Sequence, residues 1–151
     1  MFATIAAVVG TLAGAITAGL IQARIASTAR NAALVEDHRR TAVDAVAALA
    51  VALSDHRRAM WKLGDALLTG ANADRVQELR DESHRTRSAI TAPAVRVQLL
   101  VPVLDVLARP AIQATYSMRH PEDLDALDSR RRHALKTHDA FVSSASQVLA
   151  A

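Results

Sequence analysis

Apolar residues recur at alternating spacings of three and four through the middle of the chain. They are Val46, Leu49, Leu53, Met60, Leu63 and Leu67, with His56 at the position that completes the series. This spacing places one face of a helix against a core. Gly70 follows directly, where a residue that ends a helix is expected. The pattern therefore predicts a long amphipathic helix that ends near residue 70.

Two further stretches carry the same helical spacing. The first begins near Asn72 to Asp74, and its inward positions are Val76, Leu79, Ser83, Thr86, Ile90 and Val97. The second begins after Pro121, and its inward positions are Leu124, Leu127, Arg131, Ala134, His138, Phe141, Ala145 and Val148. Glu122 and Asp123 follow that proline, and a proline with acids in the first turn is typical of a helix start.

Prolines divide the region between these helices. Pro93 predicts a kink or a break. Pro102 and Pro110 interrupt the apolar stretch 95–118, which we expect to be one kinked helix or two short ones. Because short connections make long amphipathic helices antiparallel neighbours, the expected fold class is all-α, with an antiparallel helical bundle over 24–151.

The N-terminal segment carries no charge from Phe2 to Ala23, a run of 22 residues. A helix of that length rises about 33 Å, enough to cross a hydrocarbon core of about 30 Å. No proline occurs before Pro93, so nothing stops this helix at a membrane surface. We expect a single transmembrane helix over 1–23 that continues into the bundle.

Arginines follow the uncharged run and set its expected orientation. Arg24, Arg30, Arg39 and Arg40 outnumber the acids on that flank. The positive-inside rule then places the N-terminus outside and the bundle in the cytoplasm, as a single-pass protein of the inner membrane. A cleaved signal peptide is the first alternative, although no basic residue precedes the run. A helix buried in a soluble protein is the second.

Small residues line one face of the uncharged run. Gly10, Gly14 and Ala18 recur every four residues, which lets a second helix approach closely. This face predicts packing between two membrane helices, and with it a homo-oligomer, although a composition so rich in Ala and Gly produces the same spacing by chance.

The composition excludes several classes of protein. The chain has no cysteine, so disulfide scaffolds, thiol catalysis and thiolate metal sites are ruled out. No two of the six histidines lie three or four residues apart, as two metal ligands on one helix would. The sequence also lacks a glycine-rich phosphate loop and a nucleophile elbow. We therefore expect no enzyme, no catalytic residue, no cofactor and no metal.

Several arginines are candidate contacts for an anionic partner. They are Arg39, Arg40, Arg57, Arg58, Arg130, Arg131 and Arg132. The first four belong to a repeated Asp-His-Arg-Arg motif, at 37–40 and 55–58, whose copies lie five helical turns apart. Phosphate, an acidic protein or lipid headgroups would suit these side chains. Local pairs of Asp with Arg three residues later are the structural alternative.

Nucleic-acid binding is the weaker interpretation of this basic character. The isoelectric point is about 10.2, but the net charge is only +3 and aromatic residues make up 3% of the chain, too few for base stacking. Trp61 is the only tryptophan. It lies beside Met60 and Leu63, so we expect it to pack in the bundle rather than to bind a ligand.

Three segments resemble one known family. They are Asp55-His56-Arg57-Arg58-Ala59-Met60-Trp61, the stretch Glu82-Ser83-His84-Arg85-Thr86-Arg87-Ser88-Ala89-Ile90-Thr91-Ala92-Pro93, and Ala114-Thr115-Tyr116-Ser117-Met118-Arg119. Together with the short uncharged span, they are similar to the KilB-like small membrane proteins of actinomycete conjugative plasmids and their chromosomal copies. The resemblance implies a membrane-associated accessory of plasmid transfer, spread or maintenance. It implies no catalytic residues.

The expected function is that of a non-enzymatic, membrane-anchored helical protein that associates with itself or docks a partner. A membrane-tethered nucleic-acid-binding accessory of conjugation is one alternative. A membrane-perturbing toxin of the holin type is another.

Overall fold

The computed structural model describes residues 2–150, and among them the side chains of residues 22, 24 and 26–150. The helices are α1 (Phe2–Leu68), α2 (Ala73–Leu100), the short 3₁₀ helix η1 (Pro102–Leu104), α3 (Asp105–Tyr116) and α4 (Leu124–Ala150). No strand occurs in this part of the chain. The prediction of an all-α protein is confirmed.

The chain divides into two compact units, Met1–Arg39 and Arg40–Ala151. The described residues of the first unit belong to α1. Local side-chain bonds support this helix: Arg39 Nε lies 3.2 Å from Glu36 Oε2, and Arg30 Nε donates to the carbonyl oxygen of Ala26 at 3.2 Å. The predicted boundary between 1–23 and 24–151 stays a prediction.

The expected membrane localisation is wrong. Among the described residues, no helix is both long and apolar enough to cross a membrane. The prediction depended on the length of the run and on the absence of charge from Phe2 to Ala23, whereas a span also requires sufficient hydrophobicity. Thirteen of those 22 residues are Ala, Gly or Thr, which are less hydrophobic than Leu, Ile, Val or Phe. The packing face predicted on Gly10, Gly14 and Ala18 lies outside the side chains that the structure describes.

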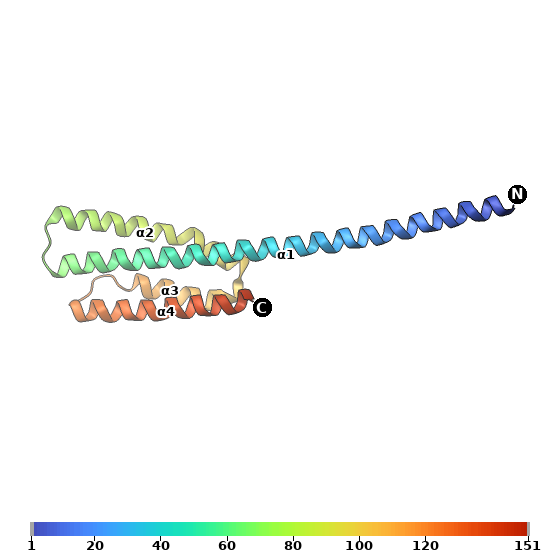
Figure 1. The fold of residues 1–151 in the computed structure, drawn as a ribbon. Coiled ribbons are helices and arrows are strands. Elements are labelled where there is room, and N and C mark those ends of the chain that lie inside the picture. The colour runs from blue at the N-terminus through green and yellow to red at the C-terminus, as the bar shows by residue number, and fades with distance from the viewer. Residues whose placement is uncertain (1, 151) are drawn as a thin grey trace. The chain divides into compact units, whose positions relative to one another are not determined.

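The second unit is an antiparallel bundle. Within it, the chain runs down α1, back along α2, down α3 and back along α4, so that consecutive helices have opposite directions (Figure 1). The connections between these helices are short, which makes sequential helices neighbours. The predicted antiparallel bundle is therefore present in this unit.

The helix ends follow from local side chains and backbone. Gly70 has a φ of +74°, a conformation that glycine adopts without steric cost, and it lies just beyond the end of α1. Asn72 Oδ1 accepts a hydrogen bond from the Arg75 amide at 2.8 Å and caps α2. Asp123 Oδ1 accepts a hydrogen bond from the Ala126 amide at 2.7 Å, so this amide in the first turn of α4 has a partner.

Pro93 neither breaks nor ends α2, which continues to Leu100. The carbonyl that loses its helical donor belongs to Ala89, an exposed residue, so water can supply the missing hydrogen bond. The break falls instead at Val101, whose φ is −139°, before η1 and α3. Pro110 lies inside α3 without ending it. The stretch 95–118 is thus the end of α2, a 3₁₀ turn and one short helix.

The core lies along one face of α1 and is built largely from the predicted inward positions, to which Leu104, Thr115 and Met118 add side chains from the stretch 95–118. Its largest fully buried side chains are Phe141, Leu49, Leu53, Ile90, Leu104, Met118, Leu127, Val97 and Thr115. Leu67, Leu124 and Val148 depart from the prediction, with 43%, 51% and 39% of their surface exposed, and Arg131 is exposed as well. The three apolar residues lie in the first or last turn of a helix.

Gly64 permits a close approach between α1 and the start of α4. A Cβ atom at this position would lie 2.9 Å from Leu127 Cδ1 and 3.4 Å from Pro121 Cγ. Leu127 is fully buried, so it has little room to retreat. A glycine at residue 64 therefore lets α4 and the α3–α4 connection pack directly onto the α1 backbone.

Replacement of Leu53 tests the core. Leu53→Ala removes a fully buried side chain, and we expect the free energy of unfolding to fall by about 2 to 5 kcal/mol. Val51→Ala, on the exposed face of the same helix, should change it by less than about 0.5 kcal/mol. Urea denaturation followed by circular dichroism measures both. Equal losses would show that α1 does not bury the predicted face.

Candidate functional site

The second unit contains a cavity of about 480 Å³, here called the basic pocket. Its apolar floor comes from Met60, Leu63, Gly64, Leu67, Met118 and Pro121. Its polar wall and rim come from His56, Arg80, Ser83, His84, Arg87, Arg119 and His120. These residues lie on α1, on α2 and in the α3–α4 connection, so the pocket exists only when three parts of the bundle come together.

His56 is buried in the wall of this pocket. Its Nδ1 lies 3.0 Å from Thr86 Oγ1. The single hydroxyl proton of Thr86 is directed to the carbonyl oxygens of Glu82, at 2.9 Å, and Ser83, at 3.1 Å. Thr86 Oγ1 must then accept, so His56 Nδ1–H is the donor. This assigns the neutral tautomer with the proton on Nδ1.

Burial lowers the pKa of His56 from 6.5 to about 4, and the positive charge of Arg87 adds to the effect. Arg87 lies with its guanidinium 4.4 Å from the centre of the Tyr116 ring, and the same ring meets His56 edge to face, with centroids 5.7 Å apart. Cation–π contact holds Arg87 over the aromatic face. His56 is therefore a neutral structural group beneath a fixed arginine.

Positive side chains surround the mouth of the basic pocket. Arg80, Arg87 and Arg119 are exposed at its rim, and no carboxylate is among its lining residues. The nearby Glu82 pairs with Lys62, with Nζ and Oε1 3.5 Å apart. Guanidinium groups bind carboxylate and phosphate through paired hydrogen bonds. The pocket thus combines an apolar floor with a rim suited to an anion.

Arg130 holds the wall of the basic pocket formed by the α3–α4 connection. Its Nη1 donates to the carbonyl oxygens of Ser117, Arg119 and His120, the shortest at 2.7 Å. Its Nη2 donates to both carboxylate oxygens of Glu122 at 2.8 Å. His120 has a φ of +50°, an unusual conformation for a residue with a side chain. One side chain of α4 therefore secures a strained connection.

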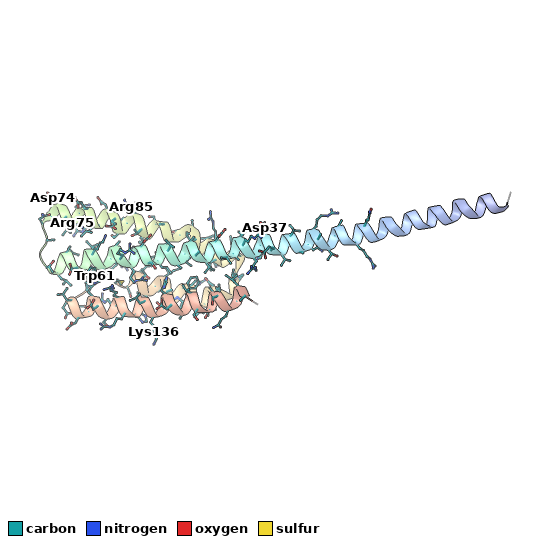
Figure 2. The ribbon with its side chains drawn as sticks, in the orientation of Figure 1. Asp37, Trp61, Asp74, Arg75, Arg85 and Lys136 are labelled. Carbon is teal, nitrogen blue, oxygen red and sulfur yellow. The ribbon has the colours of Figure 1, made fainter. Side chains whose placement is uncertain are left out.

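Three of the predicted basic contacts lie together in a second, smaller cavity of about 200 Å³, here called the arginine pocket. It is lined by Ser54, Arg57, Arg58, Trp61 and Arg131. Trp61 lies on the side of α1 that faces α4 (Figure 2), and Arg131 lies over its ring, 5.2 Å from the centroid. Trp61 packs against the core as predicted, but it also lines a cavity, which the sequence did not indicate.

The other predicted contacts lie apart from both cavities. Arg39 pairs with Glu36 in the first unit, and Arg40 begins the second. Arg130 has the structural contacts given above, and Arg132 is exposed on α4. Arg58 Nη1 and Asp55 Oδ1, 4.0 Å apart, support the interpretation of local Asp–Arg pairs. The assignment of these seven arginines as contacts stays a prediction.

The two histidines at inward positions, His56 and His138, are satisfied by hydrogen bonds. His138 Nε2 lies 3.3 Å from the carbonyl oxygen of Ala50 and 3.4 Å from Ser54 Oγ. Its Nδ1 lies 3.1 Å from Asp139 Oδ1. Within residues 2–150, no three His, Asp or Glu side chains gather as they would around a metal ion.

Sequence reasoning did not select the rim of the basic pocket, because Arg80, Arg87 and Arg119 look like ordinary solvated positions. One signal was available. Each of the three segments 55–61, 82–93 and 114–119, which carry the family resemblance, contributes residues to this pocket.

Comparison with known proteins agrees with this resemblance. The pattern of a family described as KilB plasmid transfer protein matches residues 43–149, all within the second unit. Protein KilB from Streptomyces lividans is 47% identical over 147 residues, which cover 97% of each chain. The chain belongs to the KilB plasmid transfer protein family. No solved structure matches the chain. The basic pocket is thus a feature of a KilB-family bundle.

The lowered pKa of His56 predicts a pH dependence of stability. The folded pKa, about 4, lies below the unfolded value of 6.5, so the unfolded chain takes up the proton first as pH falls. The wild type should therefore lose up to about 3 kcal/mol relative to His56→Gln between pH 6.5 and 4. Urea denaturation across this range measures the difference. A constant difference would show that folding does not lower the pKa of His56.

Removal of Arg130 should loosen the α3–α4 connection. Arg130→Met deletes all five hydrogen bonds of a side chain that is 28% exposed, and we expect a loss of about 1 to 2 kcal/mol in the free energy of unfolding. Arg132→Met is the matched control and should cost less than about 0.5 kcal/mol. Thermal denaturation compares the two. A loss as large for Arg132 would contradict the special role of Arg130.

Proposed function

We propose that this KilB-family protein is a non-enzymatic accessory of plasmid transfer that docks a protein partner in the basic pocket. The observation that carries the proposal is the rim of Arg80, Arg87 and Arg119 around a cavity whose lining residues include no carboxylate. Unpaired positive charge at a concave surface attracts a negative partner and orients it during the encounter.

The chemistry of the lining supports a protein partner over nucleic acid. Met60, Leu63 and Met118 form a buried apolar floor beneath the arginines. A protein segment with one apolar anchor and flanking acids would fill the floor and meet the rim, as hot-spot residues do in interfaces. Nucleic acid would instead need a longer track of phosphate contacts and exposed aromatic side chains for stacking.

The same lining supports a role without catalysis. Acid–base chemistry needs a titratable group placed against the reacting atoms. In the basic pocket, His56 Nδ1–H is bonded to Thr86, and Ser83 Oγ donates to the carbonyl oxygen of Arg80 at 2.8 Å. With no carboxylate in the lining, and with His84 and His120 exposed at the rim, the pocket suits binding better than proton transfer.

Charge reversal at the rim tests the proposal. We expect Arg80→Glu and Arg119→Glu each to lower plasmid transfer frequency by about tenfold or more in cells that carry only the variant gene, because each would repel an acidic segment. Arg96→Glu, an exposed position of α2 outside the pocket lining, should transfer as the wild type does. Circular dichroism and immunoblotting establish equal folding and abundance.

Two results would contradict the proposal. A normal plasmid transfer frequency with both rim variants would show that transfer does not require the basic pocket. Salt-dependent retention of DNA by the full chain, lost in the same two variants, would instead favour a nucleic-acid-binding accessory. Self-association stays a separate prediction, since its predicted residues lie outside the described side chains.

A further inference from the structure

Arg57 carries an unsatisfied hydrogen-bond donor inside the second unit. Its Nη1 is buried and has no hydrogen-bond partner. Its other terminal nitrogen, Nη2, donates to Ser54 Oγ at 3.4 Å, which is a long contact. Buried donors in folded proteins are nearly always paired. The unpaired N–H groups of Arg57 therefore indicate a place where an acceptor binds.

Arg57 lines the arginine pocket together with Arg58 and Arg131. Burial is the main cause that lowers the pKa of Arg57; the charge of Asp139 opposes this effect, and the smaller effects of Arg131 and then Arg58 add to the lowering. Three like charges thus lie close enough to repel one another. An anion in the pocket would remove this repulsion.

Acidic side chains do not neutralise the pocket from within. No carboxylate is among its lining residues. Asp55 lies 4.0 Å from Arg58, in a pair whose side chains are mostly exposed, and Asp139 is in contact with His138 Nδ1. Exposed pairs of this kind contribute little. The lining of the arginine pocket therefore carries positive charge only, although the charge of Asp139 acts on Arg57 from outside the lining.

We propose that the arginine pocket binds a phosphoryl group, with Arg57 and Arg131 as its principal contacts and Arg58 at the rim. Planar guanidinium groups match the oxygens of phosphate and supply paired donors to them. The cavity, at about 200 Å³, is smaller than the 300 Å³ or so at which pockets for whole small molecules begin, so it accommodates the phosphoryl group and little more.

Trp61 provides a direct reporter of binding. It is the only tryptophan in the chain, it lines the arginine pocket, and Arg131 lies over its ring. An anion that draws the Arg131 guanidinium toward itself changes the charge above the indole. Binding should therefore change the fluorescence of Trp61, whereas an anion bound elsewhere leaves the indole surroundings unchanged.

The experiment titrates the full chain with inorganic phosphate while chloride keeps the ionic strength constant. We expect a saturable change in Trp61 fluorescence and a rise in the midpoint of thermal unfolding. Arg131→Gln and Arg57→Gln should each weaken binding by about tenfold or more, since each removes a charge-assisted contact. Arg132→Gln, the neighbouring arginine outside the pocket, should bind as the wild type does.

Two further ligands identify the source of the phosphoryl group. Tighter binding of methyl phosphate than of inorganic phosphate would support a phosphomonoester, and the reverse order would support the free ion. Acetate that binds as tightly as phosphate would overturn the assignment to phosphoryl chemistry.

A fluorescence signal that does not saturate with phosphate, or that Arg131→Gln leaves unchanged, would overturn the site itself. Arg131 is exposed, so its replacement tests the pocket even where the Arg57 variant fails to fold. The variants in this experiment change no residue that lines the basic pocket. Their results therefore test phosphate binding independently of the proposal that a protein partner docks in the basic pocket.

Discussion

Burial of one face of α1 in the second unit is the interaction on which the rest of the bundle depends. Residues of this helix occur in all three apolar clusters of the described core, represented by Leu49, Met60 and Leu63. The other helices pack against this face rather than forming separate cores. Because both cavities are lined partly by α1, their shapes depend on the same packing that holds the unit together.

The helices and their inward faces could be predicted because helical periodicity is a local property of the sequence. Leu53, Ile90 and Phe141 are fully buried at predicted positions. The effect of Pro93 could not be predicted, since it depends on whether water reaches the carbonyl of Ala89. Membrane crossing was wrongly inferred from missing charge and helix length, and the structure does not describe the side chains of the small-residue face proposed there.

The candidate site could not be predicted from the sequence, because its lining residues come from separate parts of the chain that only the fold brings together. Arg87 and Arg119 lie on different elements, and nothing in their local sequence indicates that they share a pocket rim. The three arginines at 130–132 also have roles that their local sequence does not indicate. Arg130 hydrogen-bonds to the α3–α4 connection, Arg131 lines the arginine pocket and Arg132 is exposed. Three identical neighbours on a helix point in different directions and therefore have different roles.

The two cavities use the same stretch of α1. The basic pocket takes His56, Met60 and Leu63 from it, and the arginine pocket takes Arg57 and Trp61. A local opening of these few turns would dismantle both cavities together. Occupation of either one should therefore slow amide hydrogen exchange along the whole stretch, including at residues that touch only the other cavity. Both cavities therefore depend on the local stability of the same turns of α1, although no residue lines both of them.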